Sequence, residues 1–397
     1  MEKLQKGKRG MVFAGLLVIL SITGCARETQ NEMPKTEMME QDGRGYEKQT
    51  SDLEESEGTE TSESLTEMEE QSTEASDEAH VSFAGDICLT EDGFVIDHYD
   101  AVGQNLSECI TDDIRALTND ADIFVLNHEY PVSTRGTALA GKYYTFRANP
   151  GREEILKELG CDLVSLANNH IYDYGPDAFS DTLQVLKENE IPYMGAGENI
   201  EEAKKPVYFT VNGVKIGFLA ANRSEKTIYT PEAGENSPGV IRMYDTKMMD
   251  EMIREASSQC DYLIAYVHWG TEDSPYYEEY QREIAKEFFD AGLDALIGGH
   301  PHVLQGMEYI DGKPVIYSLG DFWFNSESKY TTIVNLDITK DGLKNVSFVP
   351  CKQENYKTRM LYGEDADAFY TYLQKLSPNA VIDSAGMAYP AELERTY

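Results

Sequence analysis

The chain has 397 residues, with 34 lysines and arginines against 71 aspartates and glutamates and a formal net charge of −37. This acidity disfavours a nucleic-acid partner, because binding to a phosphate backbone depends on lysine and arginine. The six cysteines include no C-x-x-C pair, which argues against a zinc–thiolate site and against a disulfide framework.

The first 25 residues predict a lipoprotein signal peptide. A basic start, "MEKLQKGKRG", precedes the uncharged apolar run "MVFAGLLVILSI", which is too short to span a bilayer but has the length of a signal-peptide core. The run ends in "ITGC", which resembles the bacterial lipobox with Cys25 as the lipidated residue. Lipidation would anchor the chain to the cell membrane on its extracytoplasmic face. The alternative is an ordinary secreted protein with a chance cysteine.

Residues 26–79 predict a disordered acidic linker between this anchor and a folded domain. Residues 26–80 hold 18 acidic and 4 basic side chains and almost no aliphatic ones, so they cannot bury enough apolar surface to offset the entropy of ordering. The remaining 317 residues hold 52 acidic and 26 basic side chains, so the domain is itself acidic. A bare polyanion is therefore also a poor partner unless metal ions supply positive charge.

Strand-like and helix-like runs alternate through the rest of the chain, which predicts an α/β layered fold with mixed sheets. The hairpin at 207–221 carries Asn212–Gly213 at a predicted type I′ turn. In chain order the patterns predict a strand at 80–89, a helix near 105–119, a strand at 122–127, a helix at 150–160, a strand at 161–169, a helix at 175–190, a strand at 191–197, the hairpin at 207–221, a helix near 245–258, a strand at 261–270, a helix near 276–291, a strand at 294–303, hairpins at 307–322 and 331–350, and a helix near 363–376.

Polar, metal-binding residue types follow five of the predicted strands, at the edge where open α/β sheets bind ligands. Singly, each has a structural explanation: a turn for Asp86 or the asparagines, and a core position for His268. His128 is the one we most readily interpret as structural. Together, carboxylate, amide and imidazole groups suit a two-metal hydrolytic site. The residues are Asp86; Asn127, His128 and Glu129; Asn168, Asn169 and His170; His268 and Glu272; and His300 and His302.

Eight motifs in order resemble the bacterial capsule synthesis CapA (poly-γ-glutamate biosynthesis) family, and the "GHxH" element resembles the wider calcineurin-like metallophosphoesterases. The motifs are "AGDICL", "NHEYP", "FRANP", "SLANNHIYDYG", "GAGEN", "HWGTE", "GGHPHVLQG" and "IYSLGDFWF". The resemblance covers residues 80–326. It implies a metallophosphatase-like four-layer α/β/β/α sandwich with mixed sheets, with residues 327–397 adding a C-terminal hairpin and helix that complete the domain.

The resemblance also implies roles for individual residues. Glu129 stands where the bridging carboxylate would be, and His170 where an imidazole protonates the leaving oxygen. This chain departs from the phosphoesterase pattern at Cys88, where a histidine ligand would stand, and from the CapA pattern at Asp321, where asparagine is usual. The implied ligands of two divalent ions (Mn, Fe or Zn) are Asp86, Glu129, Asn169, His268, His300 and His302.

Arg147 and Glu272 are predicted to contact substrate. Arg147 is the better candidate for an anion-binding cation and Arg223 the weaker, although a surface ion pair would explain Arg147 equally well. Glu272 is predicted either to contact substrate or to compensate for the missing histidine ligand.

The sequence favours a surface-anchored CapA-like protein that acts as a metal-dependent, phosphoesterase-like hydrolase in capsule or poly-γ-glutamate biosynthesis. Its predicted partners are a phosphoester or anionic polymer substrate and membrane proteins of capsule or poly-γ-glutamate synthesis. The alternatives are a non-catalytic polymer-binding, export or anchoring subunit of such an assembly and, as the weakest, a metal-stabilised binding lipoprotein. Whether the protein is an enzyme stays open at this point, because fold-level analogy cannot decide it.

Overall fold

The computed structural model describes residues 77–91, 95–224 and 229–391. The predicted signal peptide, Cys25 and almost all of the predicted linker lie outside these residues. Among the helices that are described, none is long and apolar enough to cross a membrane.

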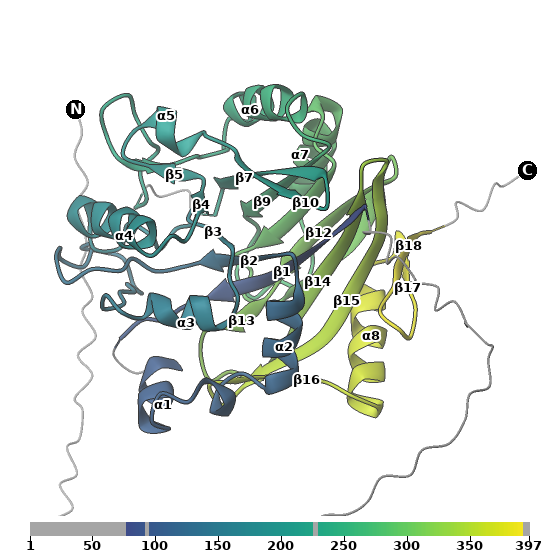
Figure 1. Ribbon diagram of the computed structural model, residues 1–397, viewed down its shortest axis with the longest axis horizontal. Helices are drawn as coiled ribbons and strands as arrows, with labels where there is room; N and C mark the ends of the chain where they lie inside the picture. Colours follow the sequence, from purple (N-terminus) through teal and green to yellow (C-terminus); the bar gives the residue numbers. More distant parts are fainter. Residues whose placement is uncertain (1–76, 92–94, 225–228, 392–397) are drawn as a thin grey trace, which may run out of the picture. The chain divides into compact units, whose positions relative to one another are not determined.

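Eight strands form the first sheet, in the spatial order β16-β15-β14-β1-β2-β3-β4, and β13 pairs with the end of β1 (Figure 1). β1 runs parallel to β2 and β13, β2 to β3, and β3 to β4, whereas β14, β15 and β16 join by antiparallel pairing. The bounds are β1 Glu78–Ile87, β2 Ile123–His128, β3 Leu163–Ser165, β4 Tyr193–Met194, β13 Asp321–Trp323, β14 Lys329–Thr339, β15 Gly342–Glu354 and β16 Lys357–Met360.

Six strands form the second sheet, in the order β11-β12-β10-β9-β7-β6. Its four inner strands are parallel, and each outer strand is the antiparallel half of a hairpin. Asn212 and Gly213 both have positive φ (50° and 80°), which confirms the predicted type I′ turn. The bounds are β6 Val207–Val211, β7 Val214–Asn222, β9 Tyr262–His268, β10 Ala295–Gly299, β11 Leu304–Ile310 and β12 Lys313–Leu319.

The helices and two small sheets complete the described elements. β5 pairs with β8, and β17 with β18. The helices are α1 Val95–Ala101, α2 Asp112–Asp120, α3 Glu153–Glu158, α4 Pro176–Glu188, α5 Ile200–Ala203, α6 Lys247–Ser257, α7 Glu279–Ala291 and α8 Glu364–Leu376, with a 3₁₀ turn at Leu106–Glu108; the short strands are β5 Ala196–Gly197, β8 Gly239–Val240, β17 Ala380–Ile382 and β18 Ala388–Pro390.

The two large sheets face each other, and helices cover their outer faces (Figure 1). Across the interface, the rings of Phe83 in β1 and Phe218 in β7 lie 6.3 Å apart between centroids, and the Tyr266 hydroxyl donates to the Ala84 carbonyl. Apolar side chains of α1 to α4 join this core, while α6 and α7 pack on the second sheet in a separate core. The predicted four-layer α/β/β/α sandwich is confirmed.

Some predicted elements differ from those observed. The helix predicted near 105–119 is wrong over its first half, because Ile110 forms a β-bridge with Thr358 and α2 begins only at Asp112. This pairing partner is far away in the sequence and leaves no local signal. The helices α1 and α5 and the strands β8 and β16 to β18 were not predicted from the sequence.

Candidate metal centre

The ends of strands from both sheets converge on one buried cluster. Within each sheet the parallel strands end at the same edge, and the two facing sheets bring these edges together. All six predicted metal ligands belong to the cluster: Asp86 near the end of β1, Glu129 after β2, Asn169 after β3, His268 at the end of β9, and His300 and His302 after β10.

Gly299, directly before His300, allows the two sheets to approach each other at this point. A Cβ atom on Gly299 would lie 2.7 Å from Asp86 Oδ1, so a larger residue would displace the carboxylate. His300 and His302 have φ values of 94° and 56°, a left-handed backbone that is rare for residues other than glycine. Such strain persists only where the surrounding structure holds it, and it is common at functional sites.

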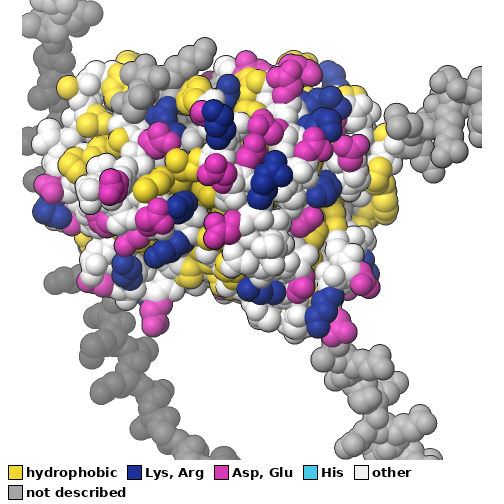
Figure 2. All heavy atoms as spheres, turned by 90° about the horizontal axis from the view of Figure 1, so that it is seen from above, with side chains coloured by type: hydrophobic (Ala, Val, Ile, Leu, Met, Phe, Trp, Pro, Cys, Tyr) yellow, Lys and Arg dark blue, Asp and Glu magenta, His cyan; other side chains and the backbone are white. Residues whose placement is uncertain are grey.

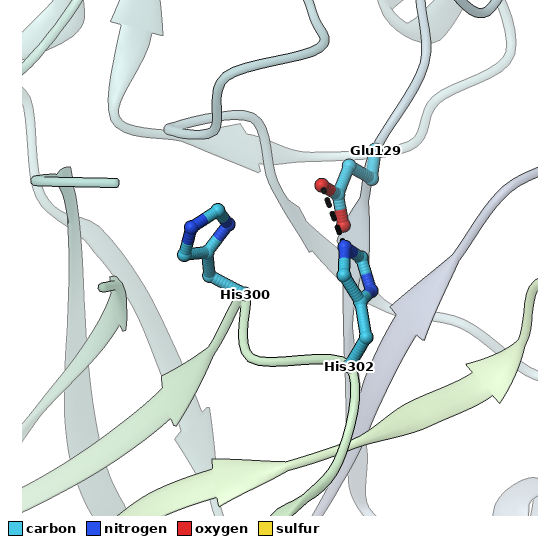
Figure 3. A group of neighbouring side chains, drawn as sticks. All are labelled: Glu129, His300 and His302. Atoms are coloured by element: carbon cyan, nitrogen blue, oxygen red, sulfur yellow. Dashed lines mark ion pairs between the residues drawn. The ribbon is translucent and has the colours of Figure 1, made fainter. Parts of the chain in front are cut away.

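Glu129 lies at the middle of the cluster. Its Oε1 atom is 3.4 Å from His268 Nε2 and 4.0 Å from His302 Nε2, and Figure 3 shows its carboxylate facing His302. The residue is fully buried, yet Oε1 has no hydrogen-bond partner among the described residues. A buried anionic oxygen without a donor is unfavourable, so this atom fits a cation.

A second imidazole group lies beside Glu129. His268 Nε2 is 2.7 Å from Asn169 Oδ1 and 3.1 Å from His300 Nδ1. Asn127, whose amide donates to Asp86 Oδ1 over 2.7 Å, also lies 3.2 Å from His268 Nδ1. Imidazole nitrogen and amide oxygen are common ligands of divalent first-row metals. The side chains of Asn169, His268 and His300 therefore fit one ion together with Glu129.

Asp321 enters the cluster from β13. Its Oδ1 lies 2.7 Å from His302 Nδ1, and the same nitrogen is 3.6 Å from Asp86 Oδ2. Three groups of side chains have ligand atoms that all lie within 4.8 Å of one another: Glu129, His300 and His302; Asp86, Glu129 and His268; and Asp86, His302 and Asp321. The donor set therefore fits a divalent metal.

The electrostatics of the cluster point to missing positive charge. Burial raises the pKa of Asp86 to about 7, with a further contribution from the Glu129 carboxylate, and burial also raises the pKa of Glu129 to about 7. Burial lowers the pKa of His268 to about 3 and that of His300 well below its usual value. Burial acts in the same direction on His302, but nearby carboxylates, chiefly Asp321, outweigh it and raise its pKa. A bound cation would relieve the repulsion between the carboxylates.

His170 lies beside the cluster and is held by a residue that the sequence analysis missed. Its Nδ1 is 2.7 Å from Asp173 Oδ2, and the Lys142 ammonium donates to Asp173 Oδ1 over 2.7 Å. The Phe146 ring covers the imidazole, with centroids 4.2 Å apart. Burial lowers the pKa of His170 despite the Asp173 carboxylate. The spacing of Asp173, three residues after His170, was the one local signal for this pair.

A pocket of about 340 Å³ leads from solvent to the cluster. His170 and His302 lie at its inner end, and Tyr144, Phe146 and Phe324 form an aromatic wall. Glu272, Asp273, Ser326, Glu327, Asn325 and Lys329 complete the lining. A larger groove of about 600 Å³, lined by residues near β4 and β6, contains none of the predicted site residues.

Of the remaining predicted residues, only Glu272 lines this pocket. Glu272 lines it but belongs to none of the three ligand groups. Arg147 is not among its lining residues; its guanidinium covers the Tyr174 ring at 4.1 Å and donates to the Arg135 carbonyl. Arg223 packs against Tyr280 at 3.8 Å, close to the end of β7. His128 is buried and stacks on Tyr130, outside the ligand groups.

The motifs that carry this cluster lie within a recognised family. The model of the bacterial capsule synthesis protein PGA_cap matches residues 80–326, more than half of the chain. The chain belongs to the PGA_cap family. Four of the six cluster ligands follow strands of the two facing sheets, and the other two, Asp86 and His268, lie at or near strand ends, all within the matched region.

Two relatives of this PGA_cap protein come from Bacillus. The PGA biosynthesis protein CapA of Bacillus subtilis (strain 168) is 29% identical over 283 residues, which cover 70% of this chain and 72% of that protein. The capsule biosynthesis protein CapA of Bacillus anthracis is 29% identical over 259 residues, covering 63% of this chain and 62% of that protein. Membership in this family connects the chain with capsule and poly-glutamate synthesis.

Solved structures with a similar arrangement are more distant from this PGA_cap protein. A hypothetical protein from Thermus thermophilus has a TM-score of 0.43 at 16% identity and covers 69% of this chain and 99% of its own. The NAD nucleotidase NadN of Haemophilus influenzae has a TM-score of 0.41 at 15% identity, and the match covers 75% of this chain and 56% of NadN.

Proposed function

We propose that this protein is a metal-dependent hydrolase of the phosphoesterase type that acts in capsule or poly-γ-glutamate biosynthesis. The observation that carries the proposal is the buried Oε1 atom of Glu129, which has no donor among the described residues and is surrounded by imidazoles and by Asp86. Packing alone does not account for such an oxygen, because a buried carboxylate is stable only when paired or hydrogen-bonded.

The six predicted ligands, from Asp86 to His302, would hold two divalent ions between the sheets. Bound ions would supply Lewis-acid chemistry, lowering the pKa of a water and stabilising charge on the substrate oxygens. Mn, Fe and Zn all accept this mixture of oxygen and nitrogen donors.

His170 is the proposed general acid. Asp173 accepts the hydrogen bond from Nδ1 of His170, which fixes the ring orientation, and when the imidazole is protonated at both nitrogens Nε2 would deliver its proton to the leaving oxygen. Lys142 and the backbone N–H of Phe146 also donate to Asp173, so its carboxylate is held in place by two other donors. The position of His170 in the pocket gives it access to substrate.

The pocket lining sets limits on the substrate. Its aromatic wall of Tyr144, Phe146 and Phe324 suits an apolar or ring-shaped group next to the reacting ester. Lys329 is paired with Asp273 at 3.0 Å and with Glu327 at 2.6 Å, which leaves the pocket mouth acidic. A substrate whose anionic group binds at the metal ions, and whose remainder is uncharged or cationic, therefore fits better than a free polyanion.

The hydrolase proposal is tested with metal-loaded protein and three chromogenic substrates: p-nitrophenyl phosphate, bis(p-nitrophenyl) phosphate and γ-glutamyl p-nitroanilide. We expect metal-dependent turnover that falls by ~10²–10⁴-fold in His170→Asn, with bound metal unchanged. His80→Asn, a change at a half-exposed histidine in β1 that pairs with Asp337, is the matched control and should leave turnover unchanged. Metal-loaded protein that hydrolyses none of these but binds poly-γ-glutamate would favour the polymer-binding alternative.

The same proposal includes a lipid anchor at Cys25 on the extracytoplasmic face of the membrane, beside membrane proteins of capsule or poly-γ-glutamate synthesis. The supporting observation is the lipobox-like "ITGC" after an apolar run. Mass spectrometry of the mature protein should find an acylated Cys25 at its N-terminus, and Cys25→Ser should move the protein out of the membrane fraction. Unchanged membrane attachment in Cys25→Ser would contradict the anchor.

A further inference from the structure

We propose that Asp321 is a direct metal ligand, which forms one ion position together with Asp86 and His302. In this position it replaces the histidine that the phosphoesterase pattern has two residues after the first aspartate, where this chain has Cys88. The inference rests on the proposed metal-dependent function and adds Asp321 to the ligands of its metal centre.

Strand pairing places Asp321 beside Asp86. β13 runs parallel to β1, and Asp86 and Asp321 are partners in the register, so both carboxylates reach the same side of the sheet. Both residues are fully buried. Oδ1 of Asp321 lies 2.7 Å from His302 Nδ1, which in turn lies 3.6 Å from Asp86 Oδ2. These three side chains thus surround one small volume from three different chain segments.

Cys88 does not take this place. Cys88 is fully buried in the apolar core, and its backbone N–H donates to the Trp323 carbonyl. Of the three groups of described residues that could hold an ion, one contains Asp321 and none contains Cys88.

Glu129 supplies an independent reason to place cations here. Its Oε1, which has no donor among the described residues, lies 4.0 Å from His302 Nε2, on the opposite side of the imidazole from Asp321. The His302 ring therefore lies between an oxygen that lacks a donor and the Asp86–Asp321 carboxylate pair. Two neighbouring buried carboxylates with one imidazole leave negative charge that a divalent cation would neutralise.

The donor types give the two ion positions different preferences. Two carboxylates and one imidazole, from Asp86, Asp321 and His302, form an oxygen-rich set that suits a hard ion such as Mn²⁺. The neighbouring side chains of Glu129, His268 and His300 supply more imidazole and suit Zn²⁺ or Fe²⁺; His268 Nε2 lies 3.4 Å from Glu129 Oε1 and 3.1 Å from His300 Nδ1. Replacing a histidine ligand with Asp321 therefore shifts the first position toward Mn²⁺.

The competing role for Asp321 is to orient His302 through Nδ1 without touching metal, as carboxylates behind metal-binding histidines do. Direct ligation and orientation predict different stoichiometries. Loss of a ligand removes an ion from its position, whereas loss of an orienting group weakens binding by about 10–100-fold and leaves the position present.

The test titrates the purified full chain with Mn²⁺, following bound metal by elemental analysis and free Mn²⁺ by electron paramagnetic resonance. At a Mn²⁺ concentration that saturates the wild type, Asp321→Ala should retain one ion fewer, while Cys88→Ser should match the wild type. Asp321→Asn, which keeps the side-chain size, should bind Mn²⁺ at this position more than about a hundredfold more weakly, beyond the range expected from loss of an orienting group. Circular dichroism checks the fold of each variant.

Four results would overturn the assignment. Asp321→Ala that keeps both ions at the saturating Mn²⁺ concentration, or Asp321→Asn with unchanged affinity, shows that Asp321 is not a ligand while the metal centre stands. Loss of an ion in Cys88→Ser assigns the position to the thiol instead. A wild-type protein that binds no Mn²⁺, Fe²⁺ or Zn²⁺ overturns the proposed function, and the assignment with it.

Discussion

Glu129 and Glu308 are both buried glutamates, but their surroundings differ. Glu308, in β11, accepts hydrogen bonds from Arg282 Nε at 3.0 and 3.2 Å, from the Tyr317 hydroxyl at 2.6 Å and from Asn379 Nδ2 at 3.1 Å. Both of its oxygens have donors. Within the described part of the chain, Glu129 has one oxygen with no donor and another that receives a 3.3 Å contact from Asn127.

The difference separates a structural carboxylate from a functional one. Glu308 links α7, β11, β12 and the segment after α8, and its charge is balanced by Arg282. Glu129 has the Asp86 carboxylate nearby, and its ion-pair partners among the described residues are imidazoles, His268 at 3.4 Å and His302 at 4.0 Å, so a bound cation would complete the balance of its charge. Burial is the same in both cases; the completeness of the donor set is what distinguishes them.

In the metal-free protein, the largest expected effect on stability comes from removing Glu308, whose hydrogen-bond donor set is complete. Glu308→Ala should lower the free energy of unfolding by about 3 kcal/mol or more, because it leaves the buried Tyr317 hydroxyl without its acceptor and also removes the acceptor of the exposed Asn379 amide. Urea unfolding in the presence of a chelator measures this, and bound metal should be unchanged. The control Glu154→Ala removes an exposed carboxylate that pairs with Lys157 and should cost under about 0.5 kcal/mol. A loss below about 1 kcal/mol for Glu308→Ala would contradict the contrast.

Metal binding beside Glu129, whose carboxylate lacks a donor for one oxygen, should stabilise the folded protein. At a metal concentration about a hundredfold above Kd, the free energy of unfolding should rise by about 2.7 kcal/mol for each independent ion that binds only the folded chain. Thermal unfolding with and without chelator measures the increment. Glu129→Gln should remove most of it while the metal-free variant stays folded. Equal melting temperatures with and without metal would argue against the site.

His128 sharpens the comparison, because it is buried outside the ligand groups and neither of its ring nitrogens has a hydrogen-bond partner among the described residues. Burial lowers its pKa from 6.5 to about 3. Between pH 3 and pH 6.5 the unfolded chain therefore binds one more proton than the folded chain. The contribution of neutral His128 to stability is complete above pH 6.5 and is lost as pH falls toward 3.

His128→Phe should remove that dependence. Between about pH 8 and about pH 5 the stability of the variant should improve relative to wild type by about 2 kcal/mol, since each pKa unit corresponds to about 1.4 kcal/mol. Chelator-treated protein in urea isolates the effect from metal binding. A stability difference between the two proteins that does not change with pH would show that His128 is not buried in its neutral form.

The sequence predicted the site well where local pattern and topology coincide. Polar residues after apolar runs marked strand ends, and parallel strands in two facing sheets bring those ends together. The structure accordingly places Asp86, Glu129, Asn169 and the three histidines in one cluster. Their roles as ligands, and that of His170 as a proton donor, stay predictions.

Features that depend on long-range pairing were less visible in the sequence. The alignment of Asp321 with Asp86 follows from β13 replacing β14 beside the end of β1, over 200 residues apart in sequence, and no periodicity shows this. The contact between Lys142 and Asp173 likewise depends on how an irregular segment before Phe146 folds over the site. Arg147 is predicted to bind an anionic substrate because basic residues are scarce in the domain. Scarcity, however, says nothing about where a side chain lies.

The most direct test of the metal centre is elemental analysis of the purified protein after reconstitution with Mn²⁺, Fe²⁺ or Zn²⁺, with His300→Ala/His302→Ala as the comparison. The site predicts about two ions per wild-type chain, and their loss in a double variant that circular dichroism shows to be folded. A folded wild-type protein that stays metal-free under all three conditions would contradict the two-metal centre and leave a binding role for the cluster. Figure 2 shows acidic side chains spread over one face of the molecule, so surface-bound metal must be removed by gel filtration before the ions are counted.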